Sequence, residues 1–198
     1  MLSTARMGDS MLKHSTPKRI FAVLSGLFLL SAFIGLFAAF ESPQMAMNVV
    51  HKIAASFGIP SPDPLQNFQK IFLNNIVVAS LITISGIFFG LGPLFFISFN
   101  GFIVGLVAGF AYSTGKASAD RVLLALLPHG IVEIPAVILA GVGGILWYKE
   151  ISTGDGRAGE RFKSGAVKAL KLLSVSVLLL FIAAIIEAYI TPRIAGIT

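Results

Sequence analysis

Apolar residues occur in long uninterrupted runs along this chain, rather than in the short alternating patterns of a soluble core. Five such runs are each long enough to cross the hydrocarbon core of a bilayer as a helix. They cover about residues 20–40, 71–89, 94–112, 122–148 and 166–190. The pattern predicts an all-α fold, a polytopic transmembrane helix bundle of about five spans.

Composition supports the same class. Hydrophobic residues make up 56% of the chain and charged residues 12%, with a mean hydropathy of +0.88. Soluble domains carry about 25% charged residues. We therefore predict a single transmembrane domain at residues 20–198, preceded by a polar N-terminal tail at residues 1–19. The lipid bilayer is then the main partner. The net charge of +6 is explained by the loops, so no nucleic-acid partner is expected.

The segment between the first two runs has an amphipathic pattern at residues 44–57. An amphipathic helix lying in the membrane interface would produce this pattern, and so would a helix packed on neighbouring spans. Pro60, Pro62 and Pro64 follow and predict a turn or an extended linker. A second amphipathic piece, Leu65–Leu73, leads into the next span.

Positive residues are unequally divided between the two sides of the predicted membrane domain. Ten Lys and Arg residues lie on the side of the N-terminal tail, and five lie on the other side. Cytoplasmic loops carry the excess of Lys and Arg in membrane proteins. We therefore predict a multi-pass protein of the cell membrane, with the N-terminus in the cytoplasm and the C-terminus outside.

Glycines recur at four-residue spacing in two of the predicted spans. They are Gly86, Gly90, Gly101, Gly105 and Gly109. Small residues at this spacing let helix backbones approach closely. The sequence thus favours a glycine-packed bundle. Packing within one subunit is the favoured interpretation, and a subunit interface or a solute path are the alternatives. A homo-oligomer, with a dimer as the default, is expected.

The fourth run holds the most informative residues. His129 and Glu133 are separated by one helical turn and share a face. Ionisable groups inside a membrane are costly and usually functional. Pro128, Gly130 and Pro135 surround them and predict a break in this helix. The span is long enough to be either one tilted helix or a re-entrant half-helix followed by a span.

Other polar residues fall within or at the edge of the apolar runs, namely Asn74, Asn75, Asn100 and Glu187. Each has a structural explanation, because an interhelical hydrogen bond contributes about 0.6 kcal/mol inside a membrane. A functional explanation applies to the group. If His129 and Glu133 face Glu187, the three side chains could form a proton relay or a cation site. The asparagines are candidate members of this ion- or solute-binding site.

Four short motifs resemble the stage II sporulation protein M family of integral membrane proteins. They are Phe72-Leu-Asn-Asn75, Asn100-Gly101 with Gly105, Leu127-Pro-His-Gly-Ile-Val-Glu-Ile-Pro135, and Ile186-Glu-Ala-Tyr-Ile-Thr-Pro192. They occur in the family's order over about residues 70–192. The resemblance implies the membrane fold and supports the polar positions, but it does not imply a role in sporulation.

Three functions remain open. The first is ion- or proton-coupled transport, or a channel-like activity, through the polar site. The second is a membrane scaffold that recruits protein partners. The third is a metal-dependent intramembrane enzyme with His129, Glu133 and Glu187 as ligands. This third function is the least favoured, because no His-Glu-x-x-His motif and no nucleophile motif is present. No catalytic residue is therefore predicted, and the only cofactor that the sequence indicates is a bound cation.

Overall fold

The computed structural model describes residues 2–57, 61–115 and 117–196, with backbone only for residues 2–15 and Phe57. Over these residues the chain is helical, and it contains no strand. Five helical stretches are long and apolar enough to cross a membrane: Thr16–Glu41, Pro64–Ser85, Leu91–Ser113, Ala119–Thr153 and Ala158–Ala195. The predicted fold class is confirmed, and the protein is a multi-pass helical membrane protein.

α1 (Leu2–Glu41) and α3 (Pro64–Ser85) both begin earlier than the sequence predicts. α1 includes most of the polar N-terminal tail. α3 joins the second amphipathic piece to its span in one helix. Asp63 explains the early start of α3, because its carboxylate accepts a hydrogen bond from the Leu65 N–H at 2.9 Å. A capping Asp followed by Pro at the first helical position is a strong start signal.

The three prolines predicted to form a turn or linker have separate places. Pro60 lies outside the described residues. Pro62 belongs to a short non-helical segment at residues 61–63, and Pro64 is the first residue of α3. The linker prediction therefore applies to Pro62, whereas Pro64 opens a helix.

The hairpin between α3 and α4 (Leu91–Ser113) turns slightly earlier than the gap between the predicted spans 71–89 and 94–112. α3 ends at Ser85, and residues 86–90 form the turn. Gly90 adopts φ +70°, a left-handed conformation that costs glycine little. Pro93 lies in the first turn of α4. Backbone N–H groups in the first turn of a helix form no intrahelical hydrogen bond, so the absence of an N–H in proline costs little there.

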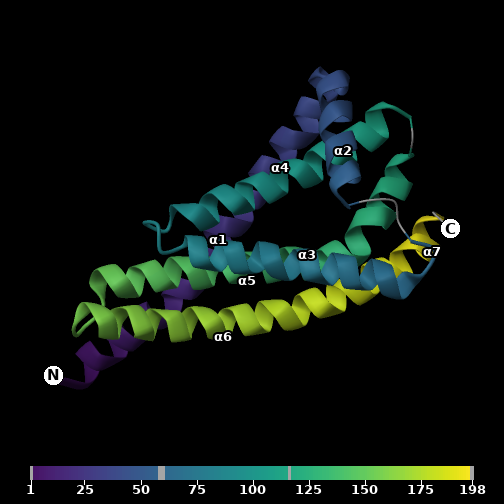
Figure 1. Ribbon diagram of the computed structural model, residues 1–198. Coiled ribbons are helices and arrows are strands. Elements are labelled where there is room, and N and C mark those ends of the chain that lie inside the picture. The colour runs from purple at the N-terminus through teal and green to yellow at the C-terminus, as the bar shows by residue number, and fades with distance from the viewer. Residues whose placement is uncertain (1, 58–60, 116, 197–198) are drawn as a thin grey trace.

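The prediction that the fourth span is broken at Pro-His-Gly is wrong. α5 (Ala119–Thr153) is one continuous helix with Pro128 and Pro135 inside it. The prolines act as a bend instead: Figure 1 shows α5 changing direction between its first turns and the longer part that lies beside α6. A proline inside a helix removes one backbone hydrogen bond, and its ring crowds the preceding turn. The other backbone hydrogen bonds of the helix can still form on either side of it.

The last span also begins before its predicted start at residue 166. α6 (Ala158–Ile185) starts where Glu160 accepts a hydrogen bond from the Arg157 N–H at 2.9 Å. Its far end continues into a π-helical turn, η1 (Ile186–Ile190), and then into α7 (Thr191–Ala195). Nothing in the hydrophobic pattern predicts this π turn.

The core lies where the spanning helices meet. Its fully buried members include one large side chain from each span: Leu24, Ile82, Ile97, Ile138 and Leu180. α1 packs most extensively on α4, and α5 on α6 (Figure 1). Many other large apolar side chains are exposed on the outside of the bundle, as expected for a lipid-facing surface.

Buried hydroxyl groups join α5 to α3 and to α6. The Ser176 hydroxyl of α6 donates to the Ala136 carbonyl at 2.7 Å. The Thr83 hydroxyl of α3 donates to the Ala140 carbonyl at 3.1 Å. Such bonds fix the rotation of packed membrane helices, because an unsatisfied hydroxyl is costly in an apolar environment. The half of α5 that follows Glu133 is thereby held firmly between α3 and α6.

The amphipathic segment forms α2 (Pro43–Phe57), close to the predicted bounds. Its Ala46 is fully buried against Ala39 of α1 and against Leu106 and Phe110 of α4. Of the two interpretations left open for this segment, packing on neighbouring spans is therefore present in the structure.

The glycines of α4 face α1 within the same chain. A Cβ placed on Gly101 or Gly105 would overlap the backbone carbonyl oxygen of Phe28 or Ala32, respectively. On the turn after α3, a Cβ on Gly86 would overlap the backbone of Gly144 in α5. These helices approach so closely that only glycine fits at the crossing points.

Candidate functional site

α5 brings His129 and Glu133 to one face, one helical turn apart. The His129 Nε2 lies 4.0 Å from the Glu133 Oε2, and both side chains are largely shielded from solvent. Pro128 and Pro135 stand on either side of the pair. Each proline lacks an N–H, so the carbonyl groups four residues earlier lose their usual helical donor. The pair therefore sits in the bent part of α5.

Glu187 reaches the same place from a segment 54 residues after Glu133 in the chain. It lies in the π turn η1, where the Thr191 N–H bonds to the Ile186 carbonyl, five residues back. The wider turn changes the direction of the side chains that follow it, and π turns of this kind are common at functional sites. One ligand atom each from His129, Glu133 and Glu187 lies within 4.8 Å of the other two. We call these three residues the polar cluster.

Thr191 is a fourth participant that the sequence did not single out. Its hydroxyl lies 3.5 Å from the His129 Nδ1, and its side chain is buried. Since Nε2 faces Glu133, both imidazole nitrogens have a polar neighbour, and the ring orientation is defined. Thr191 was visible in the sequence only as part of the Ile186–Pro192 motif. A single threonine in an apolar run does not by itself indicate a functional site.

Asn75 borders the polar cluster from α3. Its side chain is 9% exposed and faces the Glu133 carboxylate. Among the described residues, its Nδ2 atom has no partner in hydrogen-bonding geometry. Its Oδ1 accepts from the Asn74 amide at 3.4 Å. The Asn75 amide is a neighbouring donor for the Glu133 carboxylate.

The other predicted site residues lie apart from the polar cluster. The Asn100 amide donates to the Phe96 carbonyl on its own helix at 2.8 Å. In the part of the chain that the structure describes, none of the interactions found for Asn100 reaches the polar cluster. Asn74 is one step removed, through Asn75. Gly130 is buried in α5, but a Cβ there would have only ordinary contact with Ile134.

The polar cluster combines two carboxyl groups and an imidazole in the interior of the membrane domain. Among the described residues, neither carboxyl group forms an ion pair with Lys or Arg. Two carboxylates held this close cannot both remain charged without compensation, because their hydration is lost and they repel each other. Protons or a bound cation must supply the missing positive charge.

The donor set fits a divalent cation with borderline or hard character. One imidazole nitrogen and two carboxylate oxygens form a ligand set that zinc and manganese sites use, with a position left for water or substrate. In a tetrahedral zinc site the ligand atoms lie about 3.4 Å apart. Each pair of ligand atoms would have to approach by up to about 1.4 Å, which small side-chain rotations can supply. The Thr191 hydroxyl and the Asn75 amide would then orient the ligands.

Comparison with known proteins identifies relatives but no characterised mechanism. The sequence model of the family described as "Stage II sporulation protein M" matches residues 24–192. The uncharacterized protein MJ0793 of Methanocaldococcus jannaschii is 37% identical over 131 residues, 65% of this chain and 73% of that protein. Uncharacterized protein MJ0706 of the same organism is 35% identical over 142 residues. That match spans 68% of this chain but only 60% of MJ0706. No solved structure matches the chain.

Proposed function

The chain belongs to the stage II sporulation protein M family, and we propose that it is an ion transporter whose polar cluster binds a divalent cation within the membrane. The convergence of His129, Glu133 and Glu187 within 4.8 Å carries this proposal. Two residues come from α5 and the third from η1, 54 positions later than Glu133. These residues come together only when the chain folds. Their proximity is therefore not a simple result of their spacing on one helix.

Cation binding and proton release are coupled at such a site. Carboxyl groups must be deprotonated, and the imidazole must be neutral, before these side chains can act as ligands. A cation that enters the polar cluster therefore displaces the protons that otherwise neutralise the two carboxylates. Exchange of a cation for protons keeps the net charge of the membrane interior small in both states. This exchange is the chemical basis that we propose for coupled transport.

The bend of α5 provides a place where the site can change shape. The hydroxyl groups of Thr83 and Ser176 hold the segment after Pro135 between α3 and α6. Among the described residues, no bond of this kind is found for the segment of α5 before Pro128. A helix with missing hydrogen bonds at two prolines bends at a lower cost than a regular one. We propose that movement of the first segment of α5 opens the polar cluster to one side of the membrane.

Replacement of Glu133 by glutamine is expected to abolish cation-dependent flux. The substitution keeps the size of the side chain but removes one of the two negative charges that attract the cation. Flux would be measured with a metal-sensitive dye and a pH-sensitive dye enclosed in proteoliposomes. The wild-type protein should move the cation inward and protons outward, and the Glu133→Gln protein should move neither.

Glu150→Gln provides the matched control, because Glu150 is bonded to Ser164 and Lys168 at the end of α5, away from the polar cluster. Its flux should equal that of the wild type. Unchanged flux in Glu133→Gln would rule out the proposed role of the polar cluster. A membrane scaffold that recruits protein partners would then be the better explanation.

The orientation and assembly of the protein remain predictions. We propose that the N-terminus is cytoplasmic, on the basis of the positive residues. We also propose a homodimer. The Gly101–Gly109 face of α4 is used by α1 within the chain, so the dimer must use another surface. Cross-linking in native membranes, with and without detergent, would measure the oligomeric state.

A further inference from the structure

A second site lies apart from the polar cluster, at one end of the bundle. An open pocket of about 290 Å³ is lined by the last turns of α4, the first turns of α5, and the end of α7. Its walls are apolar, with Ala108 and Ala111 on α4, Ala125 on α5 and Ala195 on α7. The larger Val107, Val122 and Leu126 also line it. The volume is at the lower end of the range for small-ligand pockets.

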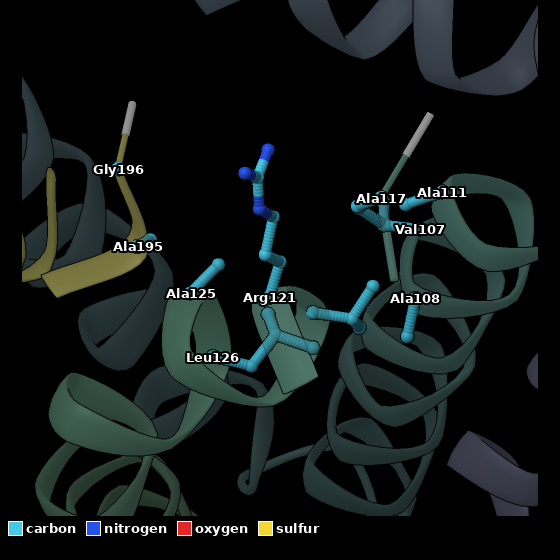
Figure 2. A pocket seen from close by; sticks show the side chains of 10 residues that line it. Val107, Ala108, Ala111, Ala117, Arg121, Ala125, Leu126, Ala195 and Gly196 are labelled. Atoms are coloured by element: carbon cyan, nitrogen blue, oxygen red, sulfur yellow. The ribbon is translucent and has the colours of Figure 1, made fainter. Parts of the chain in front are cut away.

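Arg121 is the charged residue of this pocket. Figure 2 shows its guanidinium group extending past the alanine walls toward the open side, between α4 on one side and α5 with α7 on the other. Among the described residues, Arg121 forms no ion pair, and the adjacent Asp120 is exposed. The pocket therefore combines an apolar interior with a single cationic group at its mouth.

The mouth of the pocket lies at the ends of two helical stretches that are long and apolar enough to cross a membrane. α4 ends its span at Ser113, and α5 begins its span at Ala119, only two residues before Arg121. Tyr112 is 51% exposed near the end of α4, and aromatic residues of this kind are enriched at the level of the lipid headgroups. Arg121 is thus placed where phosphate groups of the bilayer occur, with apolar walls directly below it.

These features point to one ligand chemistry. A phosphate group can form two parallel charge-assisted hydrogen bonds with a guanidinium group. The alanine side chains leave room for the first methylene groups of an acyl chain. We propose that the Arg121 pocket binds an anionic phospholipid, with the phosphate on Arg121 and the upper part of one chain between α4 and α5. This site does not depend on ion binding by the polar cluster.

The position of the pocket also connects it to the polar cluster. Arg121, Ala125, His129 and Glu133 follow one another at four-residue steps on α5, so they lie along one face. Ala195 similarly lies four residues after Thr191, which contacts His129. Eight residues, about 12 Å at the helical rise of about 1.5 Å per residue, separate Arg121 from His129 along the helix axis. A lipid bound in the pocket would lie directly beside the first segment of α5.

The absence of cysteine from the sequence allows a direct test with single introduced thiols. Ala125→Cys places a thiol on the pocket wall, and Thr153→Cys places one at the exposed far end of the same helix. The rate of alkylation by N-ethylmaleimide would be measured in nanodiscs of phosphatidylcholine, or of phosphatidylcholine and phosphatidylglycerol in equal parts. Phosphatidylglycerol should slow alkylation of Ala125→Cys about tenfold, the effect of a charge-assisted contact. Thr153→Cys should react equally in both.

Adding Arg121→Gln to Ala125→Cys should remove the protection by phosphatidylglycerol, and adding Arg121→Lys should keep part of it. Adding Glu133→Gln should leave it intact, which separates this site from the polar cluster. Equal alkylation rates in both nanodiscs, or equal protection with Arg121→Gln, would overturn the proposal. Protection by soluble hexyl phosphate in phosphatidylcholine alone, without protection by phosphatidylglycerol, would identify a soluble ligand and would also overturn it.

Discussion

Replacement of Glu187 by glutamine is expected to lower the affinity of the purified protein for Zn²⁺ or Mn²⁺ by about a hundredfold or more. Glu187 supplies one of the two carboxylates in the polar cluster, from an element that is far from α5 in the sequence. When one charged ligand is removed from a shielded site, a single carboxylate is left to balance the two positive charges of the cation. Isothermal titration in detergent would measure the affinity.

Glu160→Gln is a matched control for this measurement. Glu160 is an exposed carboxylate on the same helical segment, and it caps the start of α6 rather than facing the polar cluster. Its substitution changes the net charge equally and should leave the affinity unchanged. If Glu187→Gln binds the cation as tightly as the wild type while remaining folded, Glu187 is not a ligand. A loss of equal size in Glu160→Gln would show that net charge, rather than the polar cluster, attracts the cation.

Replacement of Gly105 by alanine is expected to separate α1 from α4 and to destabilise the bundle severely. A Cβ on Gly105 would overlap the backbone carbonyl oxygen of Ala32, and no rotation of a side chain can remove a clash with backbone. Overpacking of a well-packed interior costs about 1–3 kcal/mol, and more where the backbone itself must move. The apparent melting temperature in detergent should fall sharply, and a large fraction of the protein should aggregate.

Gly26→Ala tests whether the effect arises from this crossing point. Gly26 lies in the membrane-spanning part of α1, and a Cβ placed there meets no atom within 4 Å. Alanine is a better helix former than glycine, so this substitution should leave the melting temperature unchanged or raise it slightly. Equal stability of the Gly105→Ala and Gly26→Ala proteins would contradict the close packing of α1 on α4.

The hydrophobic pattern was sufficient to predict the fold class and the number of spans, because a helix that crosses a membrane must be long and continuously apolar. It was less reliable for helix ends. Leu65–Leu73 and the start of α6 were assigned to segments outside the spans, whereas Asp63 and Glu160 cap longer helices there. Capping depends on one side-chain hydrogen bond, which hydropathy does not reveal.

The proline-containing motif in α5 shows a second feature that the sequence alone does not determine. Pro128 and Pro135 correctly marked an irregular place, but the sequence could not distinguish a broken helix from a bent one. The outcome depends on how neighbouring helices support the residues after the proline. Here α3 and α6 hold the following segment through buried hydroxyl groups, so the helix continues.

The residues of the polar cluster were visible in the sequence as candidates, but their grouping required the structure. A costly residue in an apolar run is evident from the sequence alone, so His129, Glu133 and Glu187 were all identified. The sequence indicated Asn75 and Asn100 equally as members of the site. In the structure Asn75 borders the polar cluster, whereas the Asn100 amide bonds to a carbonyl group of its own helix. The direction of a side chain depends on helix rotation, which a single sequence does not determine.

The central claim is that the polar cluster is an ion site, and elemental analysis of the purified protein tests it most directly. Wild-type protein, His129→Ala and Glu133→Gln would be incubated with a mixture of divalent cations, separated from free metal, and analysed for bound metal. One tightly held divalent cation is expected for each wild-type chain, and none in either variant. A wild-type protein without stoichiometric metal, together with variants that are merely less stable, would contradict the claim and would make the polar cluster an internal hydrogen-bonding network.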